Sequence, residues 1–125
     1  MPISCDTSGA PARVLMTITG PWPDREEVAA LRSQLIAAGQ LNESTRALFD
    51  IRAVESVPHY LEVGRMVAAA MAQGGLPLTR AYLTASAEQE NVVGLMQTLA
   101  PSTISIDIFD DAAAAFAWLA AEPTA

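Results

Sequence analysis

Hydrophobic and polar residues alternate in four short segments of the chain, which is the period of a β-strand that buries one face. The last of these segments is the clearest, because Ile104, Ile106 and Ile108 alternate with Ser105 and Asp107. The pattern predicts strands at 13–20, 48–52, 80–85 and 103–108.

After each predicted strand, hydrophobic residues recur every three or four positions, which is the spacing of one helical face. These segments predict helices at 24–38, 59–73, 86–100 and 111–121. Strands that alternate with helices are typical of an α/β domain with parallel strands and right-handed crossovers.

Start and stop signals flank the predicted helices. The residues predicted to cap the four helices are, in chain order, Asp24, Ser56, Ser86 and Asp110. Glu27 and Gln89 stand three positions after the first and third of these caps, as in a capping box. Gly39 and the pair Gly74–Gly75 are predicted left-handed stops for the first and second helices.

Every predicted strand keeps a set of polar residues on one face, whereas a parallel sheet covered on both faces has strands that are apolar throughout. The set comprises Thr17, Thr19, Asp50, Arg52, Tyr82, Thr84, Ser105 and Asp107. We therefore expect one α/β domain at 13–125, with a four-stranded, mostly parallel sheet and helices mainly on one face. The other face is expected to be solvated or reserved for a partner. Residues 1–12 lack periodicity and are expected to fray.

Composition narrows the classes of function. A chain of 125 residues with 51% hydrophobic and 17% charged residues fits one folded domain. Its net charge is −7, its seven basic residues are scattered arginines, and it has no lysine. This distribution excludes the basic surface that nucleic acids require.

One cysteine and one histidine cannot form a disulfide within the chain or supply the ligands of a zinc site, so we expect no metal and no cofactor. The first dozen residues lack the apolar run of a signal peptide, and the longest apolar run, 112–121, is about half of a membrane span. The sequence therefore predicts a soluble cytoplasmic protein.

The strand at 48–52 and the ending at 106–119 resemble the SpoIIAA-like proteins of the STAS and anti-sigma factor antagonist superfamily. The strand ends in an Asp-apolar-Arg triplet, and the ending has an acidic cap, a run of alanines and an Ala-Trp-Leu sequence. The resemblance implies a β-α superhelix with helices on one face.

The resemblance also implies two kinds of partner. Well-known members bind regulatory proteins and are phosphorylated on a serine in the loop that follows the strand at 48–52. Ser56 is the nearest match, in a loop that reads Ala-Val-Glu-Ser-Val-Pro where the phosphorylated members carry Asp-Ser-Ser-Gly. The SpoIIAA-like branch is similar to lipid-carrying domains as well, which implies an apolar ligand or transient membrane contact.

Five polar residues in or near the strand at 48–52 are candidate binding residues. Asp50 and Arg52 are two positions apart, so they share one face of the strand and could pair or hold a polar ligand. Tyr60 is expected at the rim of the same site. Ser56, His59 and Asp50 are the residue types of a catalytic triad, but the spacing of Ser56 and His59 fits a helix start better than a nucleophile and its base.

The stretch from Met66 to Ala72 is apolar on every side of its predicted helix. Methionine adapts to irregular partners, so Met66 and Met71 are candidates for a dimer surface or for the lid of an apolar cavity. The alternative is a helix packed within the core of the domain.

These observations lead to a non-enzymatic SpoIIAA-like module that acts by contact with another protein or with a second copy of the chain. The alternative is a carrier or sensor of a small, lipid-like apolar ligand that associates transiently with membranes.

Overall fold

The computed structural model describes residues 3–6 and 13–121, which form a five-stranded sheet and four helices. The strands are β1 (Ile3–Asp6), β2 (Arg13–Gly20), β3 (Arg46–Val54), β4 (Thr79–Leu83) and β5 (Ser105–Phe109). The helices are α1 (Arg25–Ala37), α2 (Tyr60–Ala72), α3 (Ala87–Leu99) and α4 (Ala112–Ala120). The α/β class predicted from the sequence is confirmed.

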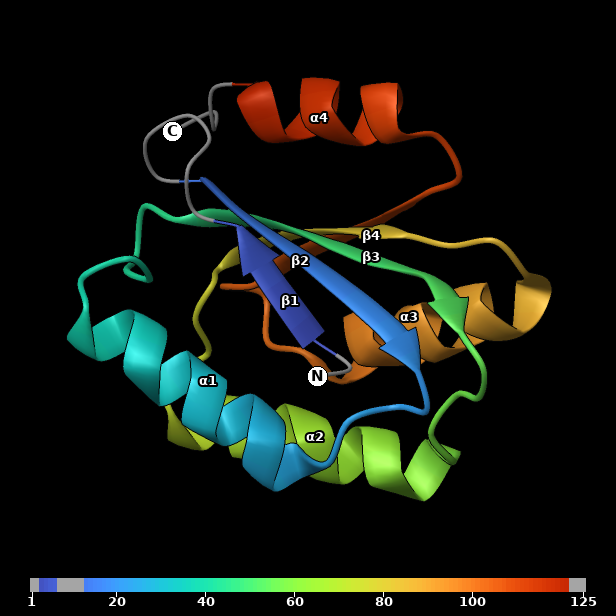
Figure 1. Ribbon diagram of the computed structural model, residues 1–125, viewed down its shortest axis with the longest axis horizontal. Coiled ribbons are helices and arrows are strands. Elements are labelled where there is room, and N and C mark those ends of the chain that lie inside the picture. Colours follow the sequence, from blue (N-terminus) through green and yellow to red (C-terminus); the bar gives the residue numbers. More distant parts are fainter. Residues whose placement is uncertain (1–2, 7–12, 122–125) are drawn as a thin grey trace.

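The order of the strands in the sheet is the order in the chain, and β2 to β5 are parallel. Each crossover therefore steps in the same direction, and right-handed crossovers that step the same way place their helices on the same face. Figure 1 shows this arrangement, with α1, α2 and α3 on one face of the sheet. The prediction that helices lie mainly on one face is confirmed.

The fifth strand, β1, lies in the segment that was expected to fray. Residues Ile3–Asp6 pair antiparallel with β2, and Ile3 stands opposite Ile18. Both isoleucines are buried in the core, which ties this strand to the sheet. Residues 3–6 do alternate between apolar and polar, but four residues are the shortest run in which this period indicates a strand, and the prediction missed it. The rest of the expected frayed segment, residues 1–2 and 7–12, lies outside the described residues.

Helix α4 covers part of the opposite face, which the sequence analysis expected to be solvated or held for a partner. Ala115 and Leu119 of α4 pack on Leu48, Ala81 and Leu83 of the sheet, and all five are buried. Figure 1 shows α4 alone on this side. Within the described residues α4 does not connect two strands, so the crossover rule does not fix its face. Apolar residues of β3 and β4 hold it there.

Arg46 fastens the end of α4 to the start of β3. Its Nη1 donates hydrogen bonds to the carbonyl oxygens of Leu119 and Ala121. The last carbonyl groups of a helix have no partners within the helix and carry a partial negative charge, so a guanidinium stabilises them.

The predicted helix stops are confirmed, but only one of the four predicted N-caps, Ser86, makes its side-chain bond. The side chain of Ser86 accepts a hydrogen bond from the backbone N–H of Gln89, and Gly39 has a φ of 72° just after α1. Asp24 is at the start of α1 but makes no side-chain cap bond. The cap of α4 is Asp111 rather than Asp110, because the chain leaves β5 one residue later than predicted.

Helices α1 and α2 make their closer backbone contacts with helices, α1 with α2 and α2 with α3, rather than with the sheet. Side chains occupy most of the space between this helical pair and the strands. None of the helices in the described part of the chain has the length and apolar character needed to cross a membrane.

Replacement of Leu119 by alanine is expected to lower the free energy of unfolding by about 2 to 5 kcal/mol, because it opens a cavity under α4. Leu119 is 1% exposed, whereas Leu99 is 45% exposed and provides the matched control, Leu99→Ala. Urea unfolding of both variants measures the difference. Equal losses in the two variants would show that α4 does not pack on the sheet as described.

Candidate functional site

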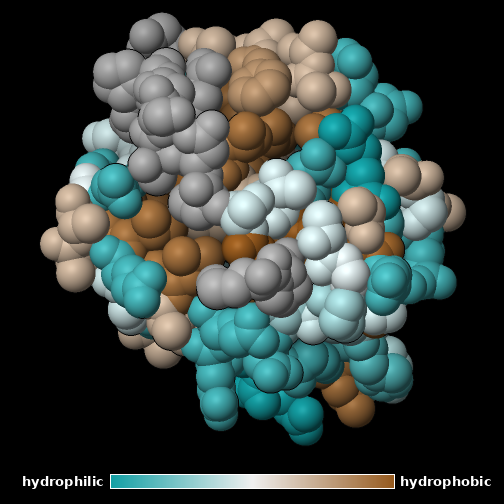
Figure 2. Space-filling model, viewed as in Figure 1, coloured by the Kyte–Doolittle hydropathy of each residue, from teal (hydrophilic) through white to brown (hydrophobic). Residues whose placement is uncertain are grey.

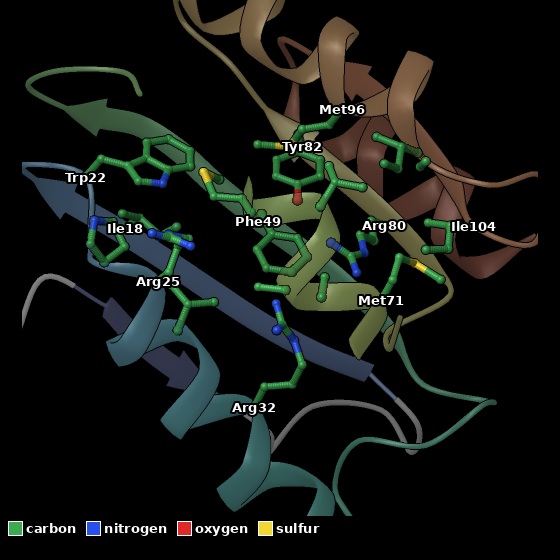
Figure 3. Close-up of a pocket in the computed structure, with 18 residues that line it drawn as sticks. Ile18, Trp22, Arg25, Arg32, Phe49, Met71, Arg80, Tyr82, Met96 and Ile104 are labelled. Atoms are coloured by element: carbon green, nitrogen blue, oxygen red, sulfur yellow. The ribbon is translucent and has the colours of Figure 1, made fainter. Parts of the chain in front are cut away.

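A pocket of about 90 Å³ lies between the sheet and the helices α1, α2 and α3 (Figure 3). Its walls are mainly hydrophobic. The apolar residues that line it include Ile18, Trp22, Val28, Phe49, Met66, Val67, Met71, Met96 and Ile106. The pocket exists because α1 and α2 pack against neighbouring helices more closely than against the strands.

The floor of the pocket is a row of aromatic residues on adjacent strands. Phe49 of β3 and Tyr82 of β4 are register partners, and their rings stack with centroids 4.8 Å apart and planes 12° apart. Tyr82 is 4% exposed. The sequence analysis placed Tyr82 and Thr84 on the polar face, but both are buried, and Tyr82 packs in the core beneath the helices. The polar face of β4 was therefore predicted wrongly.

Arg80 lies two positions before Tyr82, so both side chains are on the same face of β4. It is 8% exposed. Its Nε donates to the carbonyl oxygen of Pro77 at 2.9 Å, and its Nη2 donates to that of Gly75 at 3.1 Å. The guanidinium carbon is 6.0 Å from the centroid of the Phe49 ring, within the range of a cation–π contact.

Arg32 enters the pocket from α1. Its Nη1 donates to Oε1 of Gln73 at 2.6 Å, and the Gln73 amide donates in turn to the carbonyl oxygen of Ala29 and to Oγ of Ser33. Gln73 follows the last residue of α2, so it joins α2 to α1. Burial lowers the pKa of Arg32, and the positive charge of Arg80 lowers it further.

No aspartate or glutamate is among the described residues that line the pocket. Arg25, at its rim, pairs with Glu62 of α2 at 2.7 Å. A second arginine, Arg65 of the same helix, also lies near Glu62, with 3.7 Å between Arg65 Nη1 and Glu62 Oε1. Within the described residues, Arg32 and Arg80 form no salt bridge.

Met66 and Met71, two of the residues singled out from the sequence, line this pocket. Met66 is half-buried, and Met71 is on the exposed side of the same wall. Both methionines therefore lie on the α2 wall of the pocket, and their role in binding stays a prediction.

Asp50 and Arg52 lie apart from the pocket, on the sheet face opposite to Phe49 and Ile51. They form a two-pronged ion pair, with Arg52 Nε donating to Asp50 Oδ1 at 3.0 Å and Nη2 donating to Oδ2 at 2.9 Å. The hydrogen bond from Arg52, opposed by partial burial, holds the pKa of Asp50 below its usual value. The charges of Asp50 and Arg52 therefore balance each other within β3.

The three remaining predicted residues gather near the start of α2. Ser56 is an exposed loop residue and is not the helix cap that was predicted. His59 takes that role, because its Nδ1 accepts a hydrogen bond from the backbone N–H of Leu61 at 3.2 Å. The ring of His59 lies 4.3 Å from that of Tyr60, centroid to centroid, and both side chains are exposed.

Sequence reasoning missed Arg32, Arg80 and Tyr82 as residues of a common site. A signal was present, since Arg80 and Tyr82 are two apart in a strand. It was missed because Tyr82 and Thr84, two positions apart, were taken as the solvated face of the strand. In the described part of the chain, no group of three or more histidine, cysteine, aspartate or glutamate residues is arranged to hold a metal ion.

No protein-family model matches the sequence, and neither does any curated protein. Among solved structures, the fold is similar to that of an uncharacterized protein of the DUF3478 family from Shewanella loihica PV-4, described as having a SpoIIAA-like fold. The two sequences are 21% identical, the match covers 94% of this chain and 91% of that chain, and the TM-score is 0.65. The chain therefore has a SpoIIAA-like fold, as the resemblance in its sequence indicated.

The ion pair of Asp50 and Arg52 predicts a pH dependence of stability. A carboxylate whose pKa is lower in the folded state stabilises the fold above its unfolded pKa of about 3.9, and this contribution disappears as the pH falls through the folded value. The stability difference between the wild type and Asp50→Asn should therefore shrink as the pH falls from about 5 to about 2. NMR titration of the Asp50 carboxyl should show a higher pKa in Arg52→Met. An unchanged titration would contradict the pairing.

Proposed function

We propose that the protein is a non-enzymatic binding module that holds a small apolar ligand in the pocket between the sheet and its three-helix layer. The observation that carries the proposal is the pocket itself, a space of about 90 Å³ with mainly hydrophobic walls. Apolar concave sites with few polar groups are the usual form of small-molecule sites. We place this function in the cytoplasm, the setting expected for a chain with one cysteine.

The size of the pocket suits an alkyl segment. An apolar cavity of about 150 Å³ is sufficient for benzene, so 90 Å³ accommodates part of a chain while the rest extends toward the opening. Burial of about four to six methylene groups, at about 0.8 kcal/mol each, is worth roughly 3 to 5 kcal/mol. This corresponds to a dissociation constant on the order of 1 mM for a short, uncharged alkyl compound.

The walls of the pocket also suit chains of varied shape. Met66, Met71 and Met96 line it from α2 and α3. Methionine has three rotatable bonds and a polarizable sulfur, so a site that it lines can adapt to different ligands.

A regulatory contact with another protein, or with a second copy of the chain, is the second candidate. Tyr60 is 64% exposed and Leu61 is 58% exposed, side by side in the first turn of α2. Exposed tyrosine is enriched at protein interfaces, where it provides area at a small entropic cost. This surface supports the role that was the leading expectation from the sequence.

Octan-1-ol should bind saturably and change the fluorescence of Trp22, which lines the pocket. Trp118, a residue of α4, packs on the other face of the sheet and should not respond. Ala69→Leu should weaken binding about tenfold, because an added side chain in a filled site costs about 1 to 3 kcal/mol.

Ala68→Leu is the matched control for this experiment. Ala68 neighbours Ala69 on α2 but is exposed and outside the lining of the pocket. The proposal fails if octan-1-ol gives no saturable signal, or if both leucine variants bind it equally.

Leu61→Asp should abolish self-association if α2 carries the interface, since a charge would enter an apolar contact. Sedimentation velocity of wild type and variant over a range of concentrations measures this. A monomeric wild type would remove the second copy as the partner, and a dimer that persists in the variant would place the interface elsewhere.

A further inference from the structure

Among the described residues, two arginines in the pocket have no acidic partner, although the chain has 14 acidic residues and only seven arginines. Arg80 is 8% exposed, and Arg32 is half-buried. Neither forms a salt bridge within the described residues. Burial of a cation is costly unless an anion or several hydrogen bonds compensate it. In so acidic a protein, the lack of a carboxylate beside Arg32 and Arg80 within the described residues distinguishes this site.

The polar groups converge on one part of the pocket. Figure 3 shows the guanidinium of Arg32 rising from α1 and that of Arg80 reaching in from β4, both toward the region beside Phe49, and the Tyr82 hydroxyl pointing the same way. Tyr82 is 4% exposed and lines the pocket, so its hydroxyl is available there as a hydrogen-bond donor to a ligand.

The arginines also keep donors that the protein does not use. Nε and Nη2 of Arg80 donate to the backbone, and Nη1 of Arg32 donates to Gln73. A guanidinium carries five N–H donors, so each side chain can still bond an anion. Arg80 lowers the pKa of Arg32, and a negative charge between the two would relieve this repulsion.

We propose that the ligand is an anion with an apolar tail. Its carboxylate binds Arg32 and Arg80 and accepts a hydrogen bond from the Tyr82 hydroxyl. This inference rests on the proposed function, because the hydrophobic walls must hold the alkyl part of the same molecule. Carboxylates match the planar donor geometry of arginine. The ligand class is therefore a single-chain fatty acid or another carboxylate with an apolar tail.

A purely structural role accounts for part of the arrangement. Arg80 fixes the turn before β4 through the carbonyl groups of Gly75 and Pro77, and Arg32 links α1 to Gln73. These bonds position the guanidinium groups but leave both charges unbalanced. The two roles differ in what they predict, since a structural strut affects stability and an anion site affects the choice between charged and uncharged ligands.

The test compares octanoate with octan-1-ol, which has the same chain and no charge, and with acetate, which has the same head and no chain. Trp22 fluorescence at neutral pH should show octanoate binding at least tenfold more tightly than octan-1-ol, and acetate giving no saturation. Equal binding of the two octyl compounds would overturn the anion site while leaving the apolar pocket intact. Failure of both to bind would overturn the proposed function itself.

Variants separate the anion site from a structural role. Arg32→Met and Arg80→Met should each remove most of the preference for octanoate over octan-1-ol, and Tyr82→Phe should reduce it about threefold by loss of one hydrogen bond. Arg25→Met is the control, because Arg25 lines the pocket but already pairs with Glu62. Its preference should stay unchanged.

The ratio of the two affinities is the readout, since a structural strut would not alter it. If Arg80→Met does not fold, Arg32→Met and Tyr82→Phe decide the question. A full octanoate preference in these two variants would overturn the proposal, as would an equal loss in Arg25→Met.

Discussion

The arrangement of the molecule depends on one topological constraint, the handedness of the crossovers in a sheet whose strands follow chain order. From β2 to β5 the chain always steps toward the same edge, so α1, α2 and α3 must share one face. Three helices on one narrow sheet compete for contact with it. Helices α1 and α2 pack against their helical neighbours instead, and the space left beneath them is the pocket. Helix α4 follows the last strand and is free of this constraint.

The pocket combines hydrophobic walls with positively charged groups. Its walls are hydrophobic, so charges within it are poorly solvated, yet two guanidinium groups enter it. Backbone carbonyl groups and Gln73 hold these groups in place without neutralising them. The ion pair of Asp50 and Arg52 is the contrasting case, because its charges balance each other on the opposite face. The ion pair thus lies on a partly solvated face, whereas the positive charges of Arg32 and Arg80 lie in an enclosed pocket without a paired carboxylate among the described residues.

Much of the fold could be predicted from the sequence, since the periods of two and of three to four residues are set by burial. The α/β class, the parallel strands and the stop at Gly74–Gly75 follow from local pattern, and both glycines have positive φ. Contacts between distant segments could not be predicted in this way. Arg46 reaches the end of α4 across 73 positions of sequence, and Arg32 meets Gln73 across 41. The side of the sheet that a strand such as β4 turns toward the helices is likewise decided by packing, and Tyr82 was misplaced for that reason.

Gln73 gives the two helices above the pocket a mechanical unity. It bonds Arg32, Ala29 and Ser33 of α1 while ending α2, and Arg25 reaches Glu62 near the other end of the same helices. Two sets of contacts at separate points therefore join α1 to α2. Because Arg32 bonds Gln73 at the end of α2, one continuous helix leads from the polar end of the pocket to the exposed first turn that carries Tyr60 and Leu61.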